Sequence, residues 1–276
     1  MDVYTSAEIP FTTAVFGGET RVQTLNGSVI CKIPAGCQCG SKIRLKGKGI
    51  ISMKNPSVHG DLYVEVKIQV PKYLNPEAST EDTFGHGTAV ASIILQTDPD
   101  AQLVPLVDSA YEDGKITQVD ADELAQIIRD AVDVYGCQVI NLSAGLQKDE
   151  ADVQSAVQYA QKCGVLIVAS AGNDYLEQGE MKHYPAAYES VFAVGALNAD
   201  GTTVADFSQR GDWVNGYEIG EQASFLALSG AVKEGDGTSY AAAKVSAQAA
   251  VLWKEHPEYT VEQVFQTLGD CLKAPD

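Results

Sequence analysis

Two glycine-rich segments, far apart in the chain, carry side chains with the chemistry of nucleophilic catalysis. His86 lies in the run FGHGTAVAS (84–92), and Ser239 lies in the run GTSYAAA (237–243). Each stands among glycines and other small residues at the start of a stretch with helical periodicity. An imidazole that accepts the proton of a serine hydroxyl turns that hydroxyl into a nucleophile. The pair predicts a serine nucleophile, although a loop histidine and a helix-capping serine are the simpler interpretations of each residue alone.

Other polar groups follow apolar runs that read as buried strands. Asn173 comes after VLIV in the segment ASAGND, and Ser143, Ala144 and Gly145 come after VINL. Ligands bind at the carboxyl ends of parallel strands, so the Asn173 amide is placed to donate to a developing oxyanion, as are the N–H groups of a helix N-terminus. A turn asparagine is the alternative. The Ser143–Gly145 segment is expected to offer an extended edge to a peptide substrate.

An aspartate that would orient the histidine is not where such a site needs it. Asp82 lies too close to His86 in the sequence to end an interior strand of its own. Asp108 follows an apolar run but comes after the histidine, and Asp174 adjoins the candidate oxyanion donor. Loss of this aspartate alone leaves slow hydrolysis wherever the other groups are intact.

The elements that position these residues fall into two parts. Residues 1–74 are predicted to be all-β, because short runs alternate apolar and polar residues and Asn26-Gly27 is a hairpin signal. A polar segment, 75–85, separates them from an α/β part in which a parallel sheet is covered on both faces, giving three layers. Its expected helices are 86–96, 119–135, 149–163, 238–255 and 260–272, and its expected strands are 102–107, 138–142, 165–170 and 191–197.

The charge and cysteine content of the chain limit which partners and which cellular location are expected. Residues 1–74 carry nine Lys/Arg and five Asp/Glu (net +4), and the rest carries 10 and 32 (net −22), for −18 in all. The acidic part argues against nucleic acid as a partner. No apolar run is long enough to span a membrane, so no membrane partner is expected. The six cysteines read as reduced thiols, and the N-terminus lacks a secretory pattern, which predicts a cytoplasmic protein.

From residue 82 onward, the motifs resemble those of the subtilisin-like serine proteases, the subtilases. HGTAVAS is similar to the family's histidine motif, SAGND to its oxyanion motif, GTSYAAA to its serine motif and INLSAG to its substrate-binding strand. The resemblance implies that His86 is the general base, Ser239 the nucleophile, and Asn173 with the Ser239 N–H the oxyanion hole.

Two features of the chain depart from that family. Its serine motif usually continues with a proline and a histidine, where this chain has Ala243 and Lys244. Subtilases also begin with a strand that ends in the catalytic aspartate, and nothing before Glu81 fits that pattern. We therefore expect a subtilase-like domain that lacks its first, Asp-bearing strand.

Residues 1–74 resemble the C-terminal substrate-binding β-domain of DnaJ-type co-chaperones. The likeness runs from the Gly-Gly-Glu of FGGET through the Pro-Ala-Gly turn to RLKGKG, and Gly60-Asp61-Leu62 matches the family's Gly-Asp-Leu. This assigns Asp61 to the β-domain and not to a catalytic site. The resemblance implies binding of unfolded polypeptide. The His-Pro-Asp tripeptide of a J-domain is absent, so recruitment of the partner ATPase by that route is not expected.

The sequence thus predicts a DnaJ C-terminal-like domain over 1–74 joined to a subtilase-like peptidase domain over 82–276. The expected activity is that of a serine endopeptidase, weakened by the missing aspartate, acting on polypeptides or unfolded clients. No cofactor and no metal are expected, because no acidic cluster has the spacing of a calcium loop. The alternative is an inactive pseudoprotease that binds peptides or unfolded proteins.

Overall fold

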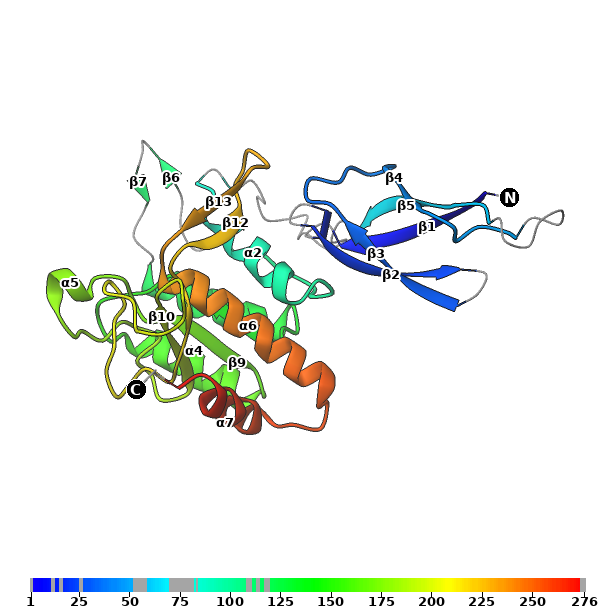
Figure 1. Cartoon of the computed structure of the whole chain (residues 1–276). Coiled ribbons are helices and arrows are strands. Elements are labelled where there is room, and N and C mark those ends of the chain that lie inside the picture. Colours follow the sequence, from blue (N-terminus) through cyan, green and yellow to red (C-terminus); the bar gives the residue numbers. More distant parts are fainter. Residues whose placement is uncertain are drawn as a thin grey trace. The chain divides into compact units, whose positions relative to one another are not determined.

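The chain forms two compact units, Met1–Lys72 and Tyr73–Asp276. Figure 1 shows the computed structural model, which describes residues 2–10, 13–14, 17–24, 27–51, 59–69, 82, 84–107, 111–112, 115–116 and 120–273. The division falls close to the end of the predicted first domain, and the polar segment that was expected to hold the boundary lies largely outside the described residues.

The first unit is built mainly from strands. β1 pairs in parallel with β5, and β5 pairs antiparallel with β4, so the sheet order is β1-β5-β4. β2 and β3 form a separate antiparallel pair in which Thr24 lies opposite Gly27. The expectation of an all-β domain needs one correction, because residues 13–14 are helical. The strands are β1 (Val3–Pro10), β2 (Gly18–Thr24), β3 (Gly27–Ile33), β4 (Lys42–Leu45) and β5 (Leu62–Gln69).

Alternation of apolar and polar residues gives this unit its own core. Along β5, Leu62, Val64 and Val66 are buried, while the residues between them are partly or fully exposed. Successive side chains of a strand point to opposite faces, so one face of β5 packs inward and the other meets solvent. The buried side chains of β1, β2 and β3 join the same cluster, which includes Ile9, Val22 and Cys31.

The second unit is centred on a parallel sheet with the order β11-β10-β9-β8. Its central strands, β9 and β10, are buried almost throughout, as expected for a parallel sheet between two helical layers. The four strands are β8 (Val139–Leu142), β9 (Leu166–Ser170), β10 (Val191–Leu197) and β11 (Gly216–Ile219), and two-stranded hairpins are formed by β6 (Tyr111–Glu112) with β7 (Lys115–Ile116) and by β12 (Ala223–Leu226) with β13 (Val232–Gly235).

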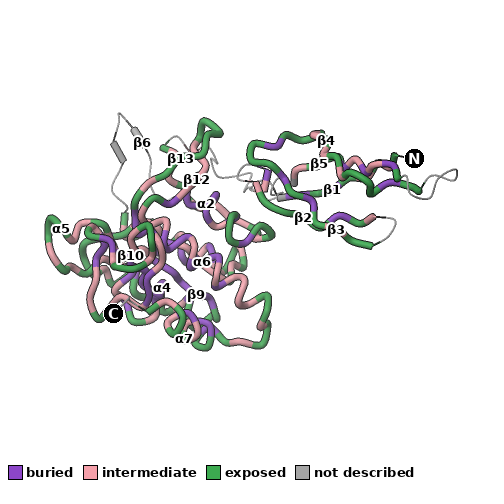
Figure 2. Tube along the Cα trace, viewed as in Figure 1, coloured by how far each residue is buried: buried purple, intermediate pink, exposed green. Residues whose placement is uncertain are grey.

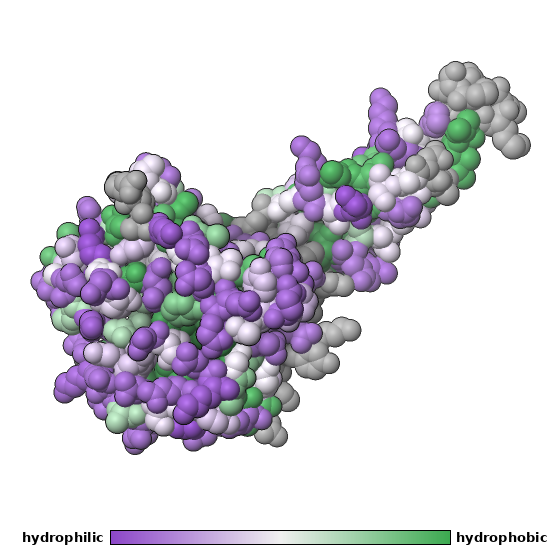
Figure 3. Space-filling view, turned by 90° about the horizontal axis from the view of Figure 1, so that it is seen from below, coloured by the Kyte–Doolittle hydropathy of each residue, from purple (hydrophilic) through white to green (hydrophobic). Residues whose placement is uncertain are grey.

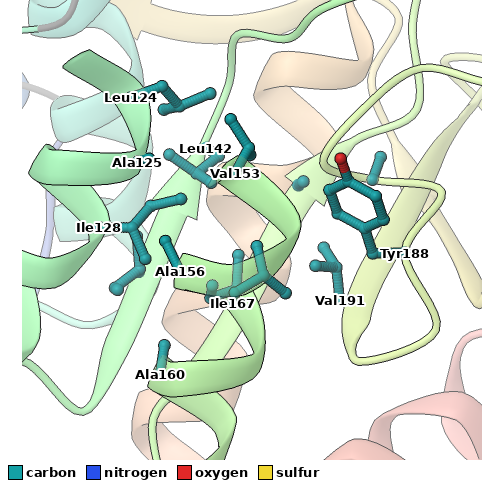
Figure 4. Close-up of a cluster of buried hydrophobic side chains, with 14 of the residues drawn as sticks. Leu124, Ala125, Ile128, Leu142, Val153, Ala156, Ala160, Ile167, Tyr188 and Val191 are labelled. Atoms are coloured by element: carbon teal, nitrogen blue, oxygen red, sulfur yellow. The ribbon is translucent and has the colours of Figure 1, made fainter. Parts of the chain in front are cut away.

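Helices cover both faces of this sheet. One face packs against α3 and α4 through the cluster in Figure 4, which includes Ile128, Val153 and Ile167. The other face packs against α6 and α7 through a second cluster around Phe192. Figure 2 shows the buried residues concentrated between these layers. The helices are α2 (His86–Thr97), α3 (Ala121–Asp133), α4 (Ala151–Lys162), α5 (Tyr175–Gln178), α6 (Thr238–Glu255) and α7 (Val261–Cys271).

All five predicted helices and three of the four predicted strands are present, but the strand expected over 102–107 is not. These residues form no strand, and their amides donate no backbone hydrogen bond to any described residue. Leu106 packs against the cluster of α3 and α4, which accounts for the apolar pattern. An apolar run becomes a strand only where a neighbouring strand pairs with its backbone, and the ladder of described strands ends at β8.

The prediction that the second unit lacks its first, Asp-bearing strand concerns residues outside the described part of the chain. Within the described part of this unit, no strand precedes α2. Residues 70–81, where such a strand would have to lie, fall outside the described residues.

The surface of the second unit reflects its composition. Figure 3 shows a face dominated by hydrophilic side chains, with hydrophobic ones scattered among them. A search of the described helices finds none that is both long enough and apolar enough to cross a membrane.

Candidate active site

Ser239 lies in the first turn of α6, the longest helix of the second unit. Gly237 precedes the helix, and Thr238 and Ser239 open it. The first N–H groups of a helix have no intrahelical acceptor. The Ser239 N–H donates no hydrogen bond to any residue that the structure describes, so it is available to an external acceptor at the positive end of the helix.

Asn173 follows β9 and is held by Thr238. Its Oδ1 accepts hydrogen bonds from the Thr238 N–H (2.8 Å) and from the Thr238 hydroxyl (2.9 Å). A backbone N–H can only donate, so the oxygen of the Asn173 amide must face Thr238 and its nitrogen must point away. Nδ2 then stands 3.6 Å from the position that a Cβ on Gly237 would occupy. Two N–H donors, Asn173 Nδ2 and the Ser239 N–H, thus meet at the beginning of α6.

The segment after β8 contacts Ser239 directly. The Ser239 hydroxyl donates to the Ser143 carbonyl oxygen (3.2 Å), and the Ser143 hydroxyl donates to the Ser239 carbonyl oxygen (3.1 Å). Asn141 Nδ2 donates to the Ser143 hydroxyl (2.9 Å), which joins this contact to β8. The backbone N–H and C=O groups of Ala144 and Gly145 form no hydrogen bond with the described residues, so an extended peptide could pair with them.

His86 opens α2, which packs against the start of α6. Val90 and Ile93 of α2 form a buried cluster with Ala243 of α6. The centroid of the His86 ring lies 6.3 Å from that of Tyr240, the residue that follows Ser239. The structure therefore brings His86 to the end of α6 that carries Ser239.

Asp82 anchors the turn that leads to His86. Its Oδ1 accepts from the N–H groups of Phe84 (3.0 Å) and Gly85 (2.6 Å), and its Oδ2 accepts from the N–H (2.7 Å) and the hydroxyl (2.8 Å) of Thr88. Burial raises the pKa of this carboxyl, but the donated hydrogen bonds outweigh burial and hold the pKa below its usual value. Asp82 thus acts as a cap for α2, and both its oxygens are engaged there.

The lowered pKa of Asp82 predicts a pH-dependent contribution to stability. The ionised carboxylate stabilises the fold above the pKa of the unfolded chain, about 3.9, and this stabilisation is lost as the pH falls through the lower folded-state pKa. We expect Asp82→Asn to lower the free energy of unfolding by about 1–2 kcal/mol at pH 7, because an amide nitrogen cannot accept from Thr88. The difference from the wild type should shrink below about pH 3.5.

Urea unfolding followed by tryptophan fluorescence measures this effect, since Trp213 and Trp253 are the two tryptophans of the chain and both lie in the second unit. Asp212→Asn is the matched control, because Asp212 is exposed. Equal midpoints for Asp82→Asn and the wild type at pH 7 would contradict the capping role.

The other candidate aspartates also have partners of their own. Asp174 Oδ1 lies 2.9 Å from His183 Nε2 and 3.0 Å from Gln209 Nε2. Asp61 belongs to the first unit, where it accepts from Arg44 Nε (2.7 Å) and from the Gly47 N–H (2.7 Å). Asp108 lies outside the described residues.

The two departures from the family's serine motif have structural roles in this chain. Ala243 is fully buried against α2, where a small side chain allows the close approach of the two helices. The ammonium group of Lys244 donates to the Ile219 carbonyl oxygen at 2.8 Å. Burial lowers the pKa of Lys244, and the nearby charge of Glu218 acts in the opposite direction.

Sequence reasoning missed the part played by Thr238. Its position directly before Ser239, at the first residue of a helix, was a usable signal. The first N–H groups of a helix have no acceptor within the helix, so the Thr238 N–H needs an acceptor from another segment. It also missed that His183 and Gln209 gather around Asp174, since neither lies in a recognisable motif.

Comparison with known proteins places this arrangement in a family. Residues 50–272 match the model of the subtilase family, and residues 1–71 match that of the DnaJ C-terminal domain. The first match covers most of the chain, which therefore belongs to the subtilase family and carries a DnaJ C-terminal domain at its start. The two matches overlap over residues 50–71, which the structure assigns to the first unit.

Individual relatives agree with both assignments. The minor extracellular protease Epr of Bacillus subtilis is 31% identical over 237 residues, covering 81% of this chain and 35% of that protein. Chaperone protein DnaJ 2 of Thermus thermophilus is 45% identical over 76 residues, covering 28% of this chain and 26% of that protein. Among solved structures, Sphericase aligns with a TM-score of 0.59 and 31% identity over 71% of this chain and 74% of that one.

The chain spans about a third of the length of the curated protease and about a quarter of that of the curated chaperone. The subtilisin-like fold is thereby established for the second unit, whose parallel sheet and helices the solved structures share.

Proposed function

We propose that the second unit is a serine endopeptidase in which Ser239 attacks the peptide carbonyl and His86 moves the protons. The observation that carries this proposal is the pair of N–H donors at the start of α6, Asn173 Nδ2 and the Ser239 N–H, beside the hydroxyl of Ser239. Neither donor has an acceptor among the described residues. Donors fixed in advance where negative charge develops are the largest single source of catalysis in acyl transfer.

The reaction follows from these groups. The Ser239 oxygen bonds to the carbonyl carbon while its proton passes to the imidazole of His86. The negative charge on the former carbonyl oxygen is then bound by Asn173 Nδ2 and the Ser239 N–H. Collapse of this intermediate breaks the C–N bond, and the imidazolium gives its proton to the leaving amine. Water, activated by His86, then hydrolyses the acyl-enzyme and restores the serine.

Before the reaction, the Ser239 hydroxyl must rotate so that it donates to the His86 imidazole and no longer to the Ser143 carbonyl oxygen. It donates to the Ser143 carbonyl, and this hydrogen bond has to give way before the proton can pass to an imidazole. A substrate chain paired with Ala144 and Gly145 would lie along the segment whose carbonyl holds the hydroxyl. Substrate binding and release of the hydroxyl would then occur at the same place.

The sequence and the described residues do not identify a carboxylate that orients His86. Asp82, Asp174 and Asp61 are each engaged by donors other than His86. Because nothing in the sequence before Glu81 fits the strand that ends in the catalytic aspartate, we propose slow hydrolysis. The same departure from the family pattern motivates the second candidate function, an inactive pseudoprotease that binds peptides along Ser143–Gly145.

Reaction with a fluorophosphonate separates the two candidates, because the probe needs an activated serine but no substrate specificity. We expect the full chain to be labelled at Ser239 and the Ser239→Ala and His86→Ala variants to remain unlabelled. Labelling of folded wild type that equals that of Ser239→Ala would rule out the endopeptidase and leave the binding module.

For the first unit we propose binding of unfolded polypeptide, in keeping with its DnaJ C-terminal domain. Tyr4 and Tyr63 support it, because they stack at 5.3 Å between ring centroids and Tyr4 is exposed, so they offer an aromatic surface to an apolar segment. Binding of fluorescein-labelled reduced casein to the Ser239→Ala chain, weakened by Tyr4→Ser, would support this role. The cytoplasmic location stays a prediction that cell fractionation can test.

A further inference from the structure

A cluster of polar side chains surrounds the turn that presents Asn173. His183 Nε2 and Gln209 Nε2 lie 2.9 Å and 3.0 Å from the same carboxylate oxygen of Asp174. Gln209 Nε2 also donates to the Gly179 carbonyl (3.0 Å), and its Oε1 accepts from the Met181 N–H (2.9 Å). Gln209 is fully buried, and its amide has partners for both donor and acceptor. The cluster joins both ends of the loop 172–183 and ties that loop to Gln209.

The same residues hold the other side of the turn. The Gln209 N–H donates to the Gly172 carbonyl at 3.0 Å. Gly172 has a φ of +113°, and a Cβ placed on it would lie 2.7 Å from Cδ2 of His183. The imidazole therefore packs on the bare face of the glycine that precedes Asn173, while its Nε2 reaches the carboxylate that follows Asn173.

Asn173 needs this support because little else packs around it. Asn173 is exposed, and among the described residues its side chain forms hydrogen bonds with Thr238, through Oδ1. Thr238 orients the amide and also holds the backbone on one side, where its hydroxyl accepts from the Gly172 N–H at 3.1 Å. The rest of the backbone from which the amide projects is set by the contacts of Gly172 and Asp174 with His183 and Gln209. A shift of this backbone would move Nδ2 from the point where the oxyanion forms, and such donors work over a narrow range of distances.

We propose that His183, Asp174 and Gln209 form a clamp that holds the turn of Asn173, so that these three act as positioning residues for the oxyanion donor. This inference rests on the proposed endopeptidase function. An oxyanion donor acts in the transition state and not on the bound substrate. Loosening the clamp should therefore lower kcat and leave KM nearly unchanged.

A double-mutant cycle tests whether the clamp acts through Asn173. We expect His183→Ala to lower kcat about tenfold for a chromogenic peptide amide, with less than about twofold change in KM. In the Asn173→Ala background the same substitution should change kcat less than about twofold, because the group it positions is gone. His183→Gln, whose amide can donate to Asp174, should restore part of the rate. His256→Ala, at the far end of α6, is the matched control and should match the wild type.

A tenfold loss that persists in the Asn173→Ala background would overturn the proposal, because it would show a general structural effect. Hydrogen exchange of the full chain supplies a readout that needs no catalysis. Peptides covering 172–175 should exchange faster in His183→Ala than in the wild type or His256→Ala, and equal exchange overturns the clamp. If the wild type is inert toward fluorophosphonate while this exchange difference is present, the endopeptidase function fails and the clamp on the turn stands.

Discussion

Replacement of Asn173 by alanine is expected to lower kcat about 10²–10³-fold with little change in KM, the range found for removal of one oxyanion donor in subtilisin, a member of the same family. The physical reason is that Asn173 Nδ2 has no acceptor among the described residues and donates a charge-assisted hydrogen bond only when the negatively charged oxyanion forms. Steady-state hydrolysis of a chromogenic peptide amide, with the full chain, measures both constants.

Asn173→Asp separates loss of the donor from disruption of the turn. An aspartate oxygen can still accept from the Thr238 N–H and hydroxyl, so the turn should keep its hydrogen bonds, but the group that would face the oxyanion can no longer donate. We expect this variant to lose at least as much activity as Asn173→Ala. An Asn173→Asp variant with nearly full activity would remove Asn173 from the oxyanion site.

For Ser239→Ala, we expect turnover to fall by only about 10², although the same change in subtilisin costs about 10⁶. In that enzyme, loss of serine, or of all three triad members together, costs about 2 × 10⁶, whereas loss of the aspartate alone costs about 3 × 10⁴. These effects are strongly non-additive. On our proposal that the catalytic aspartate is missing, the chain has already lost most of the triad's contribution, and removal of the serine takes away only the remainder.

The size of this loss reports on whether a carboxylate orients His86. Single-turnover hydrolysis of an activated ester and steady-state hydrolysis of a peptide amide, each compared with Ser239→Ala, give the ratio. A ratio near 10² fits a histidine without its aspartate. A ratio approaching 10⁶ would contradict that expectation and would mean that a carboxylate of the chain orients His86.

Helix positions followed from local signals. The helix expected over 238–255 is α6 (Thr238–Glu255), and that expected over 86–96 is α2 (His86–Thr97). A helix is indicated by the periodicity of its apolar residues and by small residues at its start. Both signals lie within one continuous segment, so they can be read from the sequence alone. The 102–107 run shows the limit, because a strand depends on a partner elsewhere in the chain, and apolar content alone does not supply one.

By itself, the sequence determined which groups are available for chemistry and in what order: an imidazole, an amide and a hydroxyl, each beside small residues at the end of an apolar element. Only the tertiary structure decided which acceptors and donors those groups meet. It turned the Asn173 oxygen toward Thr238, committed Asp82 to the cap of α2, and joined His183 to Asp174. The reason is that a hydrogen bond between residues far apart in the chain forms only where the distance between its two atoms is right to within a few tenths of an ångström. Packing of the sheet and helices sets that distance, and no local sequence pattern encodes it.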